Sequence, residues 1–217
     1  MQSTKTFTIH VLMAIIAIVV LLVMPFLTNS EEMRIFYISE GGPVQIFSAA
    51  GYVVVIVLLM REMSWADLSE NWPLVIVPLA MCLREMDFHA HFTTYSITKT
   101  TLYVSPDVPI VEKLFGALVF ILLGITAVAL VNKYWRAFLA GLRQMQPVAM
   151  AVLAGAICAV LSKVLDGASS NLQVIGIDVQ PTYFSVVAEE VLELGIPMFF
   201  AIAVFAAFPA RGSLRRV

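Results

Sequence analysis

The sequence predicts an all-α, polytopic integral membrane protein: a bundle of about six transmembrane helices forming one domain over residues 1–217. Two observations carry this prediction. Hydrophobic residues make up 60% of the chain and charged residues only 13%, whereas a soluble domain is about half apolar and a quarter charged. The apolar residues also gather in runs of roughly 18 residues, long enough to cross a hydrocarbon core as a helix.

Five of the expected spans are clear apolar runs, because each approaches the ~20 residues that a crossing requires. The first of them contains "HVLMAIIAIVVLLVMPFL" and is interpreted as an uncleaved helix, since "PFLTNSEE" at its end offers no small-x-small cleavage site. The five ranges are about 8–28, 43–61, 114–133, 147–165 and 183–208.

The sixth expected span, about 68–88, rests on a shorter apolar core. Its uninterrupted part, "PLVIVPLAMCL", covers only residues 73–83. It crosses the bilayer only if the flanking residues are included. The alternative is five crossings with a re-entrant or interfacial segment here. The loop of roughly 85–113 that follows is long, and we expect a short interfacial helix in it.

The basic residues orient the bundle, because short cytoplasmic loops carry the excess of lysine and arginine. With six spans and both termini cytoplasmic, the cytoplasmic side holds Lys5, Arg61, Lys133, Arg136, Arg143, Arg211, Arg215 and Arg216. The opposite side holds Arg34, Arg84, Lys99, Lys113 and Lys163. We therefore expect a bacterial inner (plasma) membrane protein. The formal net charge of −2 gives no indication of a nucleic-acid partner.

Ten charged or histidine side chains fall together in this topology, in the non-cytoplasmic leaflet or just above it. Glu189, Glu193 and Glu190 share one face of the last span, at about 0°, 40° and 100° around the helix. Polar stripes on apolar helices face the bundle interior or a water-filled cavity. The whole cluster comprises Arg84, Glu85, Asp87, His89, His91, Lys163, Asp166, Glu189, Glu190 and Glu193.

The last span cannot leave its glutamates unpartnered. Three ionised carboxylates near the bilayer centre cost on the order of 8–10 kcal/mol. The thirteen Val, Leu, Ile and Phe residues of 183–208 contribute roughly 4–8 kcal/mol in the opposite direction. Glu193 lies ten residues, or ~15 Å, along the helix from Tyr183. It therefore needs a proton, a cation or a basic partner such as Lys163 or Arg84.

Carboxylates beside imidazoles can hold a divalent metal such as Zn, Mn or Fe, or move protons. In "REMDFHAHF" the acids and histidines alternate, which brings them together in an extended chain and also in a helix. The candidate catalytic residues are Glu85, Asp87, Glu189 and Glu193. Candidate ligands of a phosphate or carboxylate substrate are Arg84, Lys99 and Lys163, and candidate metal ligands are His89, His91 and Asp166.

Three classes of function remain open. The first, which we expect, is a structural or assembly protein, in which the cluster fixes the helix register or docks a partner membrane subunit; the other two are alternatives. The second is a membrane-embedded, metal-dependent hydrolase acting on a lipid or lipid-linked substrate. The third is a proton- or cation-coupled transporter subunit. The chain contains no HExxH, P-loop or GxSxG motif, so no motif selects among the three.

Overall fold

The computed structural model describes residues 2–39, 41–88, 92–174 and 182–208, and these residues form only helices and the turns between them. Five helices are long and apolar enough to span a membrane: Lys5–Leu27 within α1, then α3, α8, Pro147–Gly167 within α9, and α10. The elements are α1 (Gln2–Leu27), α2 (Glu31–Ile38), α3 (Pro43–Glu62), α4 (Trp65–Glu70), α5 (Pro73–Glu85), α7 (Thr100–Val104), α8 (Ile110–Arg143), α9 (Pro147–Val174) and α10 (Tyr183–Ala207).

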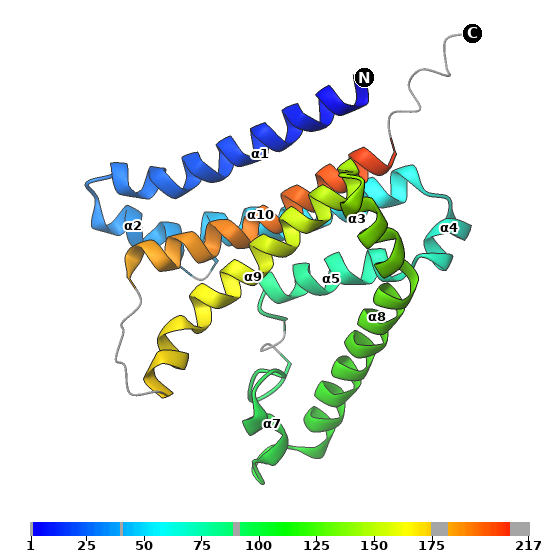
Figure 1. Ribbon diagram of the computed structural model, residues 1–217. Coiled ribbons are helices and arrows are strands. Elements are labelled where there is room, and N and C mark those ends of the chain that lie inside the picture. Colours follow the sequence, from blue (N-terminus) through cyan, green and yellow to red (C-terminus); the bar gives the residue numbers. More distant parts are fainter. Residues whose placement is uncertain (1, 40, 89–91, 175–181, 209–217) are drawn as a thin grey trace.

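Helix α10 is the centre of the bundle and the most buried of the five long helices. Helices α1, α3 and α9 all pack along it, and Figure 1 shows α1 and α9 flanking it. Gly195 permits the close approach of α9, because a Cβ atom there would lie 3.1 Å from Cys158 Sγ. His10 at the start of α1 lies beside Phe205 at the end of α10, so these two helices run antiparallel.

The range 68–88 is not one continuous helix, which differs from the span expected there. Residues 71–72 separate α4 from α5, and Pro73 begins α5 at a position where its missing N–H costs no helical hydrogen bond. The thirteen residues of α5 extend about 20 Å. Leu68 of α4 packs near the end of α3 and Glu85 contacts Gln45 near its start, so α4 and α5 together run back along α3.

Helix α8 is much longer than its expected span and stands apart from the bundle along most of its length (Figure 1). Its last third returns to the bundle, where Lys133 Nζ lies 3.1 Å from Glu70 Oε1 and the Tyr134 hydroxyl donates a hydrogen bond to Asn71. The expected short helix in the 85–113 loop is confirmed as α7, which packs against the first turns of α8.

A proline inside α1 leaves a carbonyl without its helical donor, and the fold supplies another. Pro25 has no N–H for the carbonyl of Leu21, four residues earlier. The hydroxyl of Tyr37 in α2 donates to that carbonyl over 2.9 Å. Burial raises the pKa of Tyr37, so the hydroxyl keeps the proton that it donates. Helix α2 is thereby fastened to the end of α1.

The contact between Gly51 of α3 and Pro197 of α10 sets the separation of these two helices. A Cβ atom on Gly51 would already lie 3.0 Å from the Pro197 ring. We therefore expect Gly51→Leu to lower the free energy of unfolding by about 1–3 kcal/mol, the usual cost of overpacking. The measurement is the melting temperature of the detergent-purified protein. The matched control is Gly124→Leu on α8, which has open space at its Cβ position; equal losses in both variants would contradict the close contact.

Candidate functional site: a buried charged network

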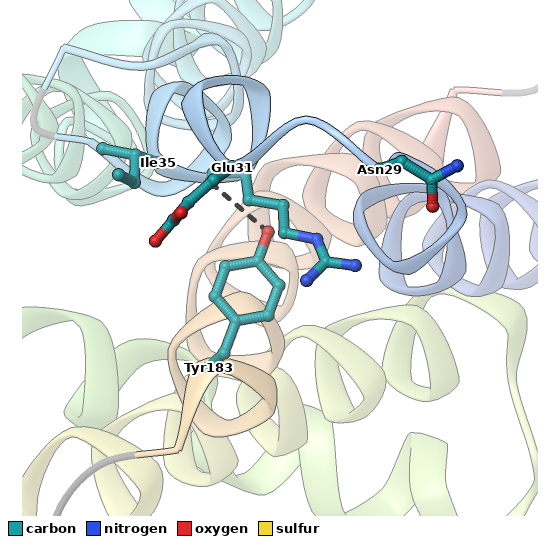
Figure 2. Close-up of a pocket in the computed structure, with 5 residues that line it drawn as sticks. Asn29, Glu31, Ile35 and Tyr183 are labelled. Atoms are coloured by element: carbon teal, nitrogen blue, oxygen red, sulfur yellow. Dashed lines mark hydrogen bonds between the residues drawn. The ribbon is translucent and has the colours of Figure 1, made fainter.

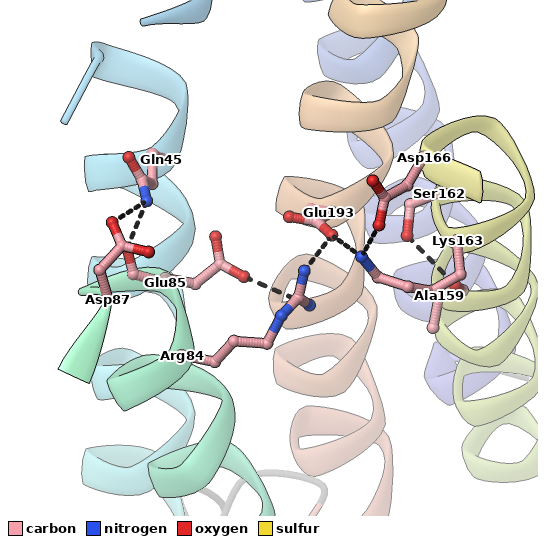
Figure 3. A network of polar contacts seen from close by, with 9 residues as sticks. All are labelled: Gln45, Arg84, Glu85, Asp87, Ala159, Ser162, Lys163, Asp166 and Glu193. Carbon is pink, nitrogen blue, oxygen red and sulfur yellow. Dashed lines mark hydrogen bonds and ion pairs between the residues drawn. The ribbon is translucent and has the colours of Figure 1, made fainter. Parts of the chain in front are cut away.

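Glu193 is the centre of a charged network that joins three helices (Figure 3). It lies on α10 with only 6% of its surface exposed. Its Oε1 atom accepts a hydrogen bond from Arg84 Nη2 of α5 at 2.7 Å and lies 3.5 Å from Lys163 Nζ of α9. The predicted need for a basic partner is thus met by both of the side chains that the sequence offered.

The end of α5 forms one side of this network. Arg84 Nη1 lies 3.9 Å from Oε1 of the neighbouring Glu85, whose side chain is buried. Gln45 of α3 donates from Nε2 to the Glu85 carbonyl at 2.6 Å and reaches Asp87 Oδ2 at 3.5 Å. Asp87 has a φ of 55°, a left-handed conformation in which aspartate is among the more tolerated residues. Gln45 therefore fixes the turn that ends α5.

The end of α9 forms the other side of the network. Lys163 Nζ lies 2.7 Å from Asp166 Oδ2, one helical turn away, and both side chains are about half exposed. Ser162 is buried and its hydroxyl donates to the Ala159 carbonyl of its own helix. Lys163 thus bridges an exposed acid and the buried Glu193, while Ser162 makes its hydrogen bond locally.

Carboxyl groups outnumber cations in this network. Glu189 and Glu190 are half-buried on α10. The charge of Glu189 interacts with Asp166, Lys163 and Glu193, and that of Glu190 with Asp87, Arg84 and Glu193. Within the described residues, the two cations Arg84 and Lys163 therefore face the acids Glu85, Asp87, Asp166, Glu189, Glu190 and Glu193.

Of three other predicted site residues, one lies outside this network and two lie outside the described residues. Lys99 is exposed at the start of α7, and no described contact of its side chain reaches Arg84 or Lys163. His89 and His91 lie outside the residues that the structure describes. Among those that it does describe, no group of three His, Cys, Asp or Glu side chains could hold a metal ion, and the carboxylate of Asp166 is paired with Lys163.

Sequence reasoning missed a polar stripe on α3. Gln45, Ser48 and Tyr52 have the i, i+3, i+7 spacing of one helix face. Ser48 is 1% exposed and Tyr52 is fully buried. The signal was present in the sequence as three polar groups in an apolar span. It was overlooked because none of them carries a charge, and charge was the criterion that selected the other candidates.

A separate pocket of about 420 Å³ lies where α2 meets the start of α10 (Figure 2). The Tyr183 hydroxyl donates to the Arg34 carbonyl at 3.3 Å, and the guanidinium of Arg34 lies 6.0 Å from the centre of the Tyr183 ring. Tyr183 thereby ties α10 to α2. The pocket is lined by Asn29, Glu31, Arg34, Ile35 and Tyr183.

Comparisons of the chain with profiles of protein families, with curated proteins and with solved structures find no match. The functional conclusion therefore depends on the charged network itself.

Reversing the charge of Glu193 tests the network directly. We expect Glu193→Lys to prevent stable accumulation in membranes, because it places a third cation beside Arg84 and Lys163. Removing one partner of a buried ion pair typically costs about 3–5 kcal/mol. Accumulation is measured by immunoblotting of purified membranes. The added change Lys163→Glu restores an opposite charge and should recover part of the protein; wild-type levels of Glu193→Lys alone would exclude the pairing.

Proposed function

We propose that this chain is a six-span protein of the bacterial inner membrane, with both termini cytoplasmic, and that it acts as a proton- or cation-coupled transporter subunit. The six-span topology is supported by the path of α4 and α5, which return along α3 from its last turns to its first. An interruption between α4 and α5 is tolerated in a membrane where protein as well as lipid surrounds it, and here α3 and α8 pack against these helices.

Cysteine labelling tests this topology. In a background with Cys82 and Cys158 replaced by alanine, we introduce single cysteines as Ser39→Cys, Thr98→Cys or Met145→Cys. A membrane-impermeant maleimide should label positions 39 and 98 from one side and position 145 from the other. If α4 and α5 instead form a re-entrant segment, positions 39 and 145 share a side and 98 lies opposite.

The excess of carboxyl groups over cations is the observation that carries the transport proposal. Arg84 and Lys163 both bond Glu193, so their two positive charges are shared between Glu193 and the neighbouring acids, Glu189 and Glu190 among them. Unbalanced carboxylates are costly at low dielectric and repel one another. Protons or small cations offset that charge, and intramembrane acids of this kind mark proton and ion pathways in pumps and transporters.

A structural or assembly role is the second candidate, and the pairing of Glu193 favours it. One carboxylate that bonds two cations from two helices fixes the register of α10 against α5 and α9. A structural role does not account for the other carboxyl groups of the network, and for this reason we prefer the transport function. The metal-dependent hydrolase with a lipid or lipid-linked substrate stays a prediction, because the histidines on which it depends lie outside the described residues.

An exchange assay in proteoliposomes tests the transport proposal. A pH-sensitive dye is enclosed, and sodium, potassium or lithium chloride is added outside. We expect the wild-type protein to move protons in response to at least one cation. The double variant Glu189→Gln, Glu190→Gln should reduce the rate at least tenfold, because it removes two of the unbalanced acids. Glu32→Gln on α2, outside the network, is the control and should retain the wild-type rate.

Two results of this assay contradict the transport proposal. One is a wild-type dye response no different from that of empty liposomes with every cation. The other is a cation response that the double variant retains in full. In the latter case the acids serve the stability of the bundle, and the structural role replaces the transport role.

A further inference from the structure

Three buried polar atoms lie at the contact of α3 with α5 and make no hydrogen bond of ordinary geometry, although the Ser48 hydroxyl lies close enough to the Glu85 carboxylate to interact with it. They are Ser48 Oγ, Tyr52 Oη and Glu85 Oε1. Ser48, Tyr52 and Glu85 are 1%, 0% and 6% exposed. The Glu85 carboxylate interacts with both Ser48 and Tyr52, so the three oxygens share one region. Buried polar groups are nearly always paired, and unpaired ones indicate a water or ion between them.

A fourth oxygen faces the same region. Pro197 in α10 has no N–H to donate to the carbonyl of Glu193, four residues earlier. A proline ring lies on the helix face of the carbonyl that it displaces. The Pro197 ring packs on Gly51 of α3, between Ser48 and Tyr52 in sequence. The freed Glu193 carbonyl therefore lies on the face of α10 that meets α3.

The prolines inside α1 and α10, two of the three that lie in the interior of described helices, differ in what their freed carbonyls bind. At Pro25 the carbonyl of Leu21 receives a hydrogen bond from the Tyr37 hydroxyl. At Pro197 no described side chain donates to the Glu193 carbonyl, although the Tyr52 hydroxyl is buried on the facing helix without a partner. The Tyr52 hydroxyl is thus a buried donor on the facing helix that makes no hydrogen bond. This contrast favours a cation, which several oxygen atoms coordinate at once, over a single hydrogen bond.

We propose that Ser48 Oγ, Tyr52 Oη, the Glu85 carboxylate and the Glu193 carbonyl bind one small monovalent cation of the sodium or lithium type. The set is all oxygen, which suits hard cations. It combines one carboxylate with neutral oxygens and a carbonyl freed from a helix, the ligands that hold Na⁺ in broken transporter helices. This inference rests on the proposed transport function and names its coupling ion.

The charges around the site select a monovalent ion over a divalent one. Glu85 supplies one negative charge, and Glu190 and Glu193 add theirs from α10. Arg84 opposes them, since its guanidinium contacts both Glu85 and Glu193. Lys163 also contacts Glu193, from the α9 side. These three carboxylates and two cations leave one negative charge. A monovalent cation neutralises it, whereas a divalent cation would leave an excess positive charge beside Arg84.

Thermal unfolding in different salts tests the site without any knowledge of the transported solute. The detergent-purified, full-length protein is melted in sodium, lithium, potassium or choline chloride at equal ionic strength. We expect sodium or lithium to raise the melting temperature by roughly 5–10 °C over choline at a concentration about 100-fold above Kd. Potassium should have a smaller effect, because its larger radius fits a site formed by packed helices less well.

Substitutions that remove single oxygens locate the effect. Ser48→Ala and Tyr52→Phe should each abolish the sodium-dependent rise. In choline they should melt at the wild-type temperature or above it, because an unpaired buried hydroxyl is lost. The controls are Ser162→Ala and Tyr37→Phe, which remove hydroxyls outside the site and should keep the full rise whatever their melting temperature in choline.

The outcomes separate this inference from the transport proposal. A wild-type protein that melts at one temperature in all four salts holds only water at these oxygens, which overturns the cation site. A sodium-dependent rise retained by both Ser48→Ala and Tyr52→Phe also overturns it. Proton exchange in proteoliposomes without such a rise would leave transport intact and reject the site. The rise without exchange would confirm the site and reject transport.

Discussion

The attachment of Glu193 to Arg84 and Lys163 is the interaction on which the bundle depends. A carboxylate this deep in an apolar assembly is costly unless it is paired and hydrogen-bonded. Its two partners come from α5 and α9, so the requirement of one side chain determines where two helices lie. The apolar contacts of α10 then act on helices already in register, such as the approach of Cys158 to Gly195.

One turn of α10 contains both the buried charge of Glu193 and the proline, Pro197, that interrupts the helical hydrogen bonds. Glu193 offers a side-chain carboxylate to α5 and α9, and Pro197 frees the carbonyl of that same residue toward α3. A helix that needed only to be held would require neither the proline nor the additional acids. The combination of a freed carbonyl, a Glu85 oxygen without a hydrogen bond and two further glutamates is the reason that we propose an ion-coupled function rather than a structural clamp alone.

Apolar run length and helix periodicity predicted the helical class and the common face of the three glutamates, because both depend on local spacing alone. They also led to Arg84 and Lys163 as partners of Glu193, since the expected topology placed few other cations nearby. The interruption between α4 and α5 was not anticipated, although Asn71, Trp72 and Pro73 stand there. The prediction of one span over 68–88 depended on hydrophobicity, whereas the energy of packing α4 against α3 cannot be inferred from composition.

Arg84 links the structural and the ionic roles of the site. Its guanidinium bonds Glu193 and forms a longer ion pair, of 3.9 Å, with the Glu85 oxygen that accepts no hydrogen bond. A cation bound at Glu85, as we propose, would therefore compete with Arg84 for negative charge and weaken the attachment of α5 to α10. Linkage requires the reverse as well: a tighter pair between Arg84 and Glu193 lowers the affinity for the cation. The ion pair that holds α5 in place is thus also the element through which occupancy of the site would be transmitted to the arrangement of the helices.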